Sequence, residues 1–155
     1  MTIYLVRHAK AGERGAWDGE DTLRPLTAQG HRQARALLDV LADARFERVL
    51  SSPYVRCMET VVPLAAERKL AVEPVDALAE GADLDDVLSL VHKHAPGGVV
   101  FSTHGDIVPM LLDYVASRGV DIGPTPQWPK ASTWVLETDD TGEITEARYL
   151  GLPPN

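Results

Sequence analysis

The stretch Thr2-Ile3-Tyr4-Leu5-Val6-Arg7-His8-Ala9 decides how the rest of the chain is interpreted. Its apolar part, residues 3–6, combines β-branched, aromatic and aliphatic side chains, which is typical of a buried strand. The run ends at Arg7 and His8, and a loop rich in glycine and charge follows over residues 10–24. Ligands of open α/β sheets bind outside the carboxyl ends of the strands, so this pair is predicted to lie at a binding site.

A second apolar run ends in the same way. Residues 98–102 are predicted to form another buried strand, and Thr103-His104-Gly105 follows at its carboxyl end. A strand predicted over residues 47–51 leads into Ser51-Ser52. Parallel strands point their carboxyl ends the same way, so His8, His104 and the two serines are expected along one rim.

The remaining elements alternate between strand and helix patterns. Helices are predicted after the capping residues Thr27, Ser52 and Asp83 and over residues 107–118. Further strands are predicted over residues 70–75, 133–138 and 144–150. This order predicts an α/β fold, a three-layer sandwich whose mostly parallel sheet carries helices on both faces and a hairpin at one edge.

Two details of the helices can be tested. Ser52-Pro53 is predicted to start a helix that runs to about Arg68, with serine as the cap and proline in the first turn. Its buried face is predicted to consist of Val55, Met58, Val62 and Ala65. The helix that Asp83 caps is expected to end at Pro96-Gly97.

Composition limits the classes of function. The 155 residues fit one domain, expected to span residues 1–155. An excess of 23 acidic over 15 basic residues, a formal charge of -8, argues against nucleic-acid or membrane partners, so any phosphate site must be a local cluster of cations. A single cysteine excludes an internal disulfide. The low cysteine content and the lack of a leader-like or membrane-spanning apolar segment lead us to expect a cytoplasmic protein.

The side chains expected at the rim suit phosphoryl chemistry. A neutral imidazole such as that of His8 is a competent nucleophile toward phosphorus. Arg56 is expected on the first turn of a helix, where free backbone amides already favour an anion. Arg7 and Arg56 could hold one phosphoryl group through bidentate hydrogen bonds, and a protonated His104 would add a donor.

The combination of motifs resembles the histidine phosphatase superfamily, the phosphoglycerate-mutase-like enzymes. The matching segments are Arg7-His8, Leu26-Thr27-Ala28-Gln29-Gly30, Ser51-Ser52-Pro53 with Arg56 and Glu59-Thr60, and Thr103-His104-Gly105. The short form, with Arg24-Pro25-Leu26-Thr27, is most similar to the SixA-type phosphohistidine phosphatases. It is also similar to the phosphatase half of certain Nudix fusion proteins that act on nucleotides.

The resemblance implies roles for individual residues. His8 would be the phosphorylated nucleophile, Arg7, Arg56 and His104 would form the phosphate pocket, and Glu80 would be the proton donor. Rival donors are Asp106 and the acidic loop residues Asp18, Glu20 and Asp21. The substrate-binding residues are expected to be Lys10, Arg24, Ser51 and Gly105. No cofactor and no metal ion are expected.

Several alternatives remain open from the sequence. The expected substrate is a phosphohistidine on a protein; a nucleoside di- or triphosphate or another small phosphate ester also fits the pocket chemistry. A metal-dependent phosphoesterase that uses His8 and His104 is a second hypothesis. A phosphate-binding module without turnover is a third. His92 and His94, two apart on a helix, are interpreted as surface residues.

Overall fold

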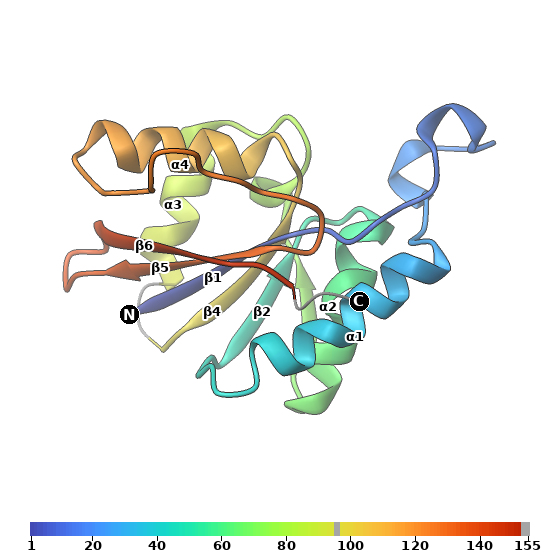
Figure 1. The fold of residues 1–155 in the computed structure, drawn as a ribbon, viewed down its shortest axis with the longest axis horizontal. Coiled ribbons are helices and arrows are strands. Elements are labelled where there is room, and N and C mark those ends of the chain that lie inside the picture. The colour runs from blue at the N-terminus through green and yellow to red at the C-terminus, as the bar shows by residue number, and fades with distance from the viewer. Residues whose placement is uncertain (95–96, 153–155) are drawn as a thin grey trace.

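The computed structural model describes residues 1–94 and 97–152, and it shows helices packed on both sides of one mixed sheet (Figure 1). The strands are β1 (Thr2–Arg7), β2 (Arg48–Ser51), β3 (Val72–Pro74), β4 (Val99–Thr103), β5 (Thr133–Thr138) and β6 (Ile144–Leu150). The helices are α1 (Ala28–Val40), α2 (Val55–Glu67), α3 (Leu84–His94) and α4 (Ile107–Ser117), and the 3-10 turns are η1 (Arg14–Ala16), η2 (Asp21–Leu23) and η3 (Asp76–Leu78).

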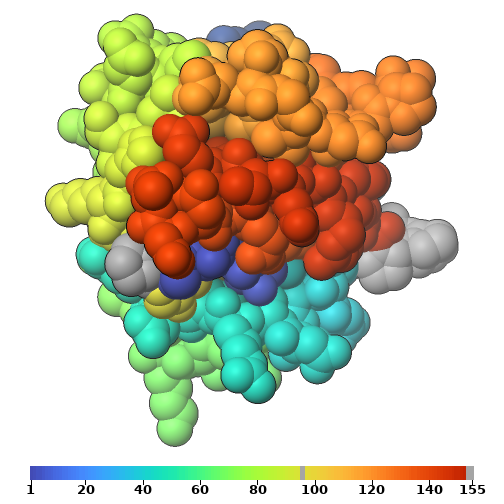
Figure 2. Space-filling view, turned by 90° about the vertical axis from the view of Figure 1, so that its left-hand side faces the viewer, coloured from blue at the N-terminus to red at the C-terminus, as the bar shows by residue number. Residues whose placement is uncertain are grey.

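The sheet has the strand order β3-β2-β4-β1-β5-β6. β1 runs parallel to β4, and β2 runs parallel to both β4 and β3. β5 is antiparallel to β1 and to β6, so the last two strands form a hairpin at one edge. In the space-filling view this hairpin crosses the surface between α4 and α1 (Figure 2). The predicted α/β fold with a mostly parallel sheet and an edge hairpin is confirmed.

Each face of the sheet has its own apolar core. Ile3 and Leu5 point from β1 into a core that α3 and α4 cover, whereas Val6 points into a core under α1 and α2. This alternation follows from the two-residue period of a strand. All three side chains are fully buried. The covered faces hold the ends of β1, β2 and β4 rigidly beside one another.

The start of α2 differs from the prediction. Ser52 does not cap the helix, which begins at Val55 with Tyr54 as its N-cap residue. The Ser52 backbone N–H instead donates to the carbonyl of Ser102, which continues the pairing with β4 for one residue. Of the predicted buried face only Ala65 is fully buried, whereas Val55 and Met58 are half-buried and Val62 is 48% exposed. The buried positions are Arg56, Cys57, Thr60, Val61, Leu64 and Ala65. The first turn of this buried face is polar, so a pattern of apolar residues does not predict it.

Smaller differences concern α3 and β3. His94 is buried rather than on the surface, and Arg48 Nη1 donates to its Nδ1 over 3.2 Å. His92 is exposed, as predicted. The predicted helix end at Pro96 lies outside the described residues. β3 covers only 72–74 of the predicted 70–75. Within the described ranges, no helix is long and apolar enough to cross a bilayer.

Candidate active site

A cavity of about 380 Å³ opens at the carboxyl ends of β1 and β4. Its lining consists of Arg7, His8, Lys10, Ala11, Gly12, Glu13, Arg14, Arg24, Arg56, Glu80, His104, Gly105, Asp106 and Lys130. Its floor consists of the buried His8, Arg56 and His104 and the half-buried Arg7. The exposed members, mostly charged, form its mouth. A larger cavity of about 670 Å³, against β5 and β6, contains no histidine or cysteine, so the chemistry points to the smaller one.

His8 follows directly on β1, and its backbone N–H donates to the carbonyl of Thr103 over 2.9 Å. Its Nδ1 lies 2.7 Å from the carbonyl of Ala9. A carbonyl only accepts, so Nδ1 carries the hydrogen and Nε2 keeps its lone pair. Burial, together with the nearby His104 and Arg56, lowers the pKa of His8 to about 3 against the effect of the Ala9 bond. The imidazole is therefore a neutral, oriented nucleophile.

Arg7 is held by a segment from the far end of the chain. Its Nη1 donates to the carbonyl of Trp128 over 2.8 Å. Ala131, fully buried and in the left-handed region with φ 66°, donates its N–H to the carbonyls of both Arg7 and His8. A non-glycine residue in that region is strained, and such strain is often found at functional sites. Gly105 lies close to the guanidinium, because a Cβ there would be 2.7 Å from Arg7 Cζ.

Arg56 is 1% exposed on the first turn of α2. Its Nη1 donates to the backbone carbonyl of Asp21 over 2.9 Å, and its Nη2 donates to Asp21 Oδ2 over 3.1 Å. The guanidinium also stacks 4.8 Å from the centre of the Tyr54 ring. Buried Nε atoms of both Arg7 and Arg56 have no hydrogen-bond partner. A buried guanidinium with unused donors is suited to receive an anion.

His104 completes the floor. Its ring centre lies 5.6 Å from that of His8, with the rings inclined at 69°. Its Nε2 shares a hydrogen bond of 2.8 Å with Ser52 Oγ, and its buried Nδ1 has no partner. Burial and the charge of Arg56 lower the pKa of His104 to about 4. The histidine is neutral in the empty pocket, and a bound dianion would favour its protonated form.

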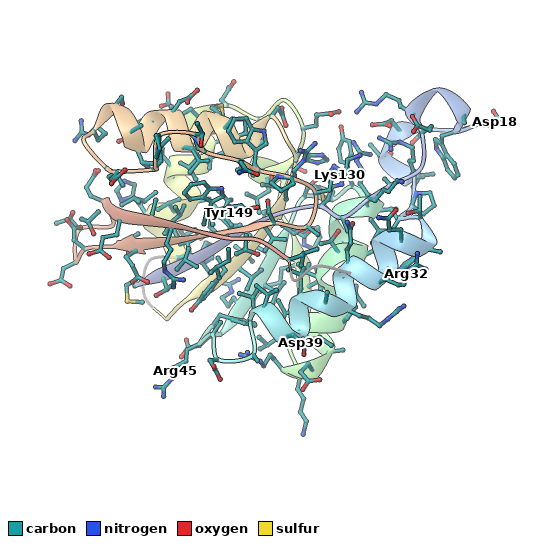
Figure 3. The ribbon with its side chains drawn as sticks, in the orientation of Figure 1. Asp18, Arg32, Asp39, Arg45, Lys130 and Tyr149 are labelled. Carbon is teal, nitrogen blue, oxygen red and sulfur yellow. The ribbon has the colours of Figure 1, made fainter. Side chains whose placement is uncertain are left out.

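The carboxylates differ in what they contact. Glu80 lines the cavity, and Arg14 Nη2 donates to its Oε1 over 3.0 Å. Asp106 also lines the cavity and accepts a hydrogen bond from the N–H of Gly81. Asp21 contacts Arg56 and Arg24 rather than the cavity. Asp18 lies at the outer tip of the loop, well away from the cavity (Figure 3). Glu20 is exposed and does not line the cavity.

Three of the four residues expected to bind substrate line the cavity, and one does not. Lys10 and Gly105 line the cavity. Arg24 also lines it, but its guanidinium is engaged by Asp21 and by the carbonyl of Gly12. Ser51 is not part of the site, because it is fully buried and its hydroxyl donates to the carbonyl of Ser52.

Several contacts of the floor were not predicted from the sequence. Trp128 and Ala131 bond to Arg7 and His8, and Lys130 joins the mouth. Ser52, which was expected on this rim, bonds to His104. The signal available in the sequence was that residues 128–131 come just before a predicted strand. Among the described residues, no group of three or more His, Cys, Asp or Glu side chains is arranged to hold a metal ion.

Comparison with known proteins gives consistent matches. The family model of the histidine phosphatase superfamily (branch 1) matches residues 3–85. A protein of Mycolicibacterium smegmatis named 8-oxo-(d)GTP phosphatase is 34% identical over 98% of this chain, which spans only 48% of that relative. A phosphohistidine phosphatase SixA homolog of Haemophilus influenzae is 25% identical over 93% of both chains. The structure of the protein histidine phosphatase SixA complexed with tungstate shares the fold, with a TM-score of 0.71 at 20% identity over 97% of this chain and 95% of that one.

Proposed function

This chain belongs to the histidine phosphatase superfamily, and on that premise we propose that it is a phosphatase whose reaction passes through a phosphohistidine on His8. One observation carries the proposal. Nδ1 of His8 is occupied by the Ala9 carbonyl, so the lone pair of Nε2 is available beside Arg7 and Arg56. We further propose that residues 1–155 form one catalytic domain.

The first chemical step transfers the phosphoryl group to the protein. Two guanidiniums, of Arg7 and Arg56, and Nδ1 of His104 bind its equatorial oxygens and stabilise their charge during transfer. Nε2 of His8 attacks phosphorus, and the bond from phosphorus to the leaving group breaks. A carboxylic acid at Glu80 supplies the proton that the leaving group needs.

The second step returns the protein to its starting state. The carboxylate of Glu80 takes a proton from a water molecule, which attacks the phosphohistidine. The bond from phosphorus to Nε2 breaks, and inorganic phosphate leaves with His8 neutral again. Ser52 assists by holding the ring of His104 in place through its 2.8 Å hydrogen bond.

The position of Glu80 favours substrates with a good leaving group. Its Oε1 accepts a hydrogen bond from Arg14, so part of the carboxyl group is engaged by another side chain rather than directed at a leaving group. A phosphoramidate makes a small demand on the acid, because its nitrogen leaves readily once protonated. We therefore propose a phosphohistidine on a protein as the first substrate class, in agreement with the similarity to the SixA homolog.

A nucleotide is the second substrate class. It is supported by the 34% identity to the mycobacterial protein named for its action on 8-oxo-(d)GTP. A nucleoside di- or triphosphate also has a good leaving group, so it fits the same constraint on Glu80.

The test is a His8→Ala variant assayed for hydrolysis of 4-nitrophenyl phosphate and for trapping of labelled phosphate on the protein. We expect the loss of both, whereas His92→Ala, a change at an exposed histidine of α3, should retain both. Retained turnover in His8→Ala refutes the proposal. Activity abolished by EDTA would favour the metal-dependent alternative, and phosphate binding without turnover by the wild type would favour a binding module.

A further inference from the structure

We propose that Lys10 and Lys130 form a second anion-binding subsite at the mouth of the cavity, and that it binds the non-scissile phosphate of a nucleoside diphosphate. The inference rests on the proposed function, because it takes the scissile phosphate to be held at His8. It concerns the second of the two substrate classes above, the nucleotides.

The first argument is an excess of positive charge. Six cationic residues line the cavity of a protein whose formal charge is -8: Arg7, Lys10, Arg14, Arg24, Arg56 and Lys130. Three of them already face carboxylates, since Arg14 pairs with Glu80 and both Arg24 and Arg56 pair with Asp21. Among the described residues, no carboxylate forms a salt bridge with Lys10 or Lys130, and Lys10 Nζ donates only to the neutral Gln29 Oε1, over 3.2 Å.

The second argument is that both lysines are attached to rigid backbone beside the nucleophile. Lys130 directly precedes Ala131, whose N–H is shared by the carbonyls of Arg7 and His8. Lys10 lies two residues after His8, and its N–H donates to Gln33 Oε1 while its carbonyl accepts the N–H of Thr27. Gly30 packs so tightly on that carbonyl that a Cβ would come within 2.0 Å of its oxygen.

The third argument is that the two ammonium groups share one positive field. The pKa of Lys130 is lowered first by partial burial and then by the charges of Arg7, Lys10 and Arg24, against the opposite effect of the Glu13 carboxylate. Figure 3 shows Lys130 at the rim, where it faces the loop between β1 and α1. An anion seated between Lys10 and Lys130 would relieve this repulsion, and it would lie in the same cavity as His8.

These features fit a diphosphate better than a monoester. Arg7, Arg56 and His104 already suffice for the terminal phosphoryl group, so the two lysines are left for its neighbour. In the reaction, His8 attacks the terminal phosphorus, the bridging oxygen leaves with the nucleoside monophosphate, and water later releases inorganic phosphate. A phosphate leaving group needs little help from an acid, which agrees with the engagement of Glu80 by Arg14.

The experiment compares ADP, 4-nitrophenyl phosphate and a phosphohistidine peptide as substrates for wild type, Lys10→Ala, Lys130→Ala and the double variant. The exposed Lys93 of α3 supplies the matched control, Lys93→Ala. We expect the wild type to hydrolyse ADP. Each lysine change should lower kcat/KM for ADP roughly tenfold, the effect of one charge-assisted hydrogen bond, and should lower kcat/KM for 4-nitrophenyl phosphate clearly less.

Binding without turnover separates this inference from the proposed function. Methylenediphosphonate, which cannot be hydrolysed, should bind to the wild type at least tenfold more tightly than inorganic phosphate, and the double variant should lose that advantage. Equal affinities, or equal losses for both ligands, overturn the subsite. Hydrolysis of the phosphohistidine peptide without any hydrolysis of ADP would overturn the assignment to diphosphates. If no substrate is hydrolysed, the proposed function fails, while the binding comparison still decides the subsite.

Discussion

Gly105→Ala should disable the phosphate pocket without removing any of its charged groups. The new Cβ would lie 2.7 Å from Arg7 Cζ and Nη2 and 2.9 Å from Nε, where ordinary contacts begin at about 3.4 Å. The guanidinium must therefore retreat by about 0.7 Å or more. That retreat strains or breaks its 2.8 Å hydrogen bond to the carbonyl of Trp128.

The substitution should lower catalytic activity but leave the stability of the fold nearly unchanged. The atoms that clash are the end of a flexible side chain, and Gly105 does not need a positive φ, so the backbone accepts alanine. A charge-assisted hydrogen bond contributes about 1.5–3 kcal/mol, and losing one or two of them from Arg7 to the phosphoryl group removes roughly 2–4 kcal/mol. That corresponds to a fall in kcat/KM of about thirty- to a thousandfold.

The assay is hydrolysis of 4-nitrophenyl phosphate, with thermal unfolding as the measure of stability. Gly15→Ala is the matched control, because a Cβ there meets nothing within 4 Å. Combining Gly105→Ala with Arg7→Gln should add little to the loss from Arg7→Gln alone, since both changes remove the same interaction. Activity within threefold of wild type in Gly105→Ala, or full additivity of the two changes, would refute this account of Arg7.

Two further predictions concern protons. Glu80→Gln should slow hydrolysis of an alkyl phosphate by at least tenfold and that of 4-nitrophenyl phosphate much less, because only the poorer leaving group needs the acid. Equal losses for the two substrates would point to Asp106 as the acid, which Asp106→Asn would test. In the folded protein the pKa of His8 is lowered to about 3 and that of His104 to about 4, whereas a histidine of the unfolded chain has a pKa near 6.5. Below pH 6.5 the unfolded chain therefore binds more protons than the folded protein. The free energy of unfolding should therefore decrease as the pH falls from 7 to 5, by about 1.5–2 kcal/mol for each histidine. In denaturant titrations, the free energy of unfolding of His8→Ala and of His104→Ala should each depend less steeply on pH than that of the wild type. An unchanged slope in both variants would contradict the burial argument.

The sequence was sufficient to predict the residues at the centre of the floor. Arg7, His8 and His104 each follow an apolar strand, and strand period and strand ends are local properties of the chain. Once the strands were predicted to be parallel, those ends had to meet at one rim, and the structure brings them together there. Arg56 was placed on a first helical turn, where it lies, although the helix begins later than predicted.

The errors share a physical cause. The stripe predicted to be buried on α2 was chosen for apolar residues, but its first turn faces a polar site, so Arg56, Cys57 and Thr60 are buried instead. Ser52 follows capping preferences, yet its hydroxyl is bonded to His104, a residue 52 positions away. His94 was predicted to be exposed but is buried, where Arg48 bonds to its ring. Local sequence preferences give a wrong prediction where a residue distant in the sequence bonds to the same side chain or buries it.

By itself the chain determined the α/β order and the identity of the four residues that meet around the cavity floor, because each depends on patterns within a few neighbouring positions. Only the tertiary structure decided how they are used. The bond from Arg7 to Trp128 spans 121 positions, and Arg14 and Glu80 meet across 66. The same packing brings Lys130 to the mouth. Such pairs follow from where loops pack on a finished sheet, and no local pattern encodes that packing.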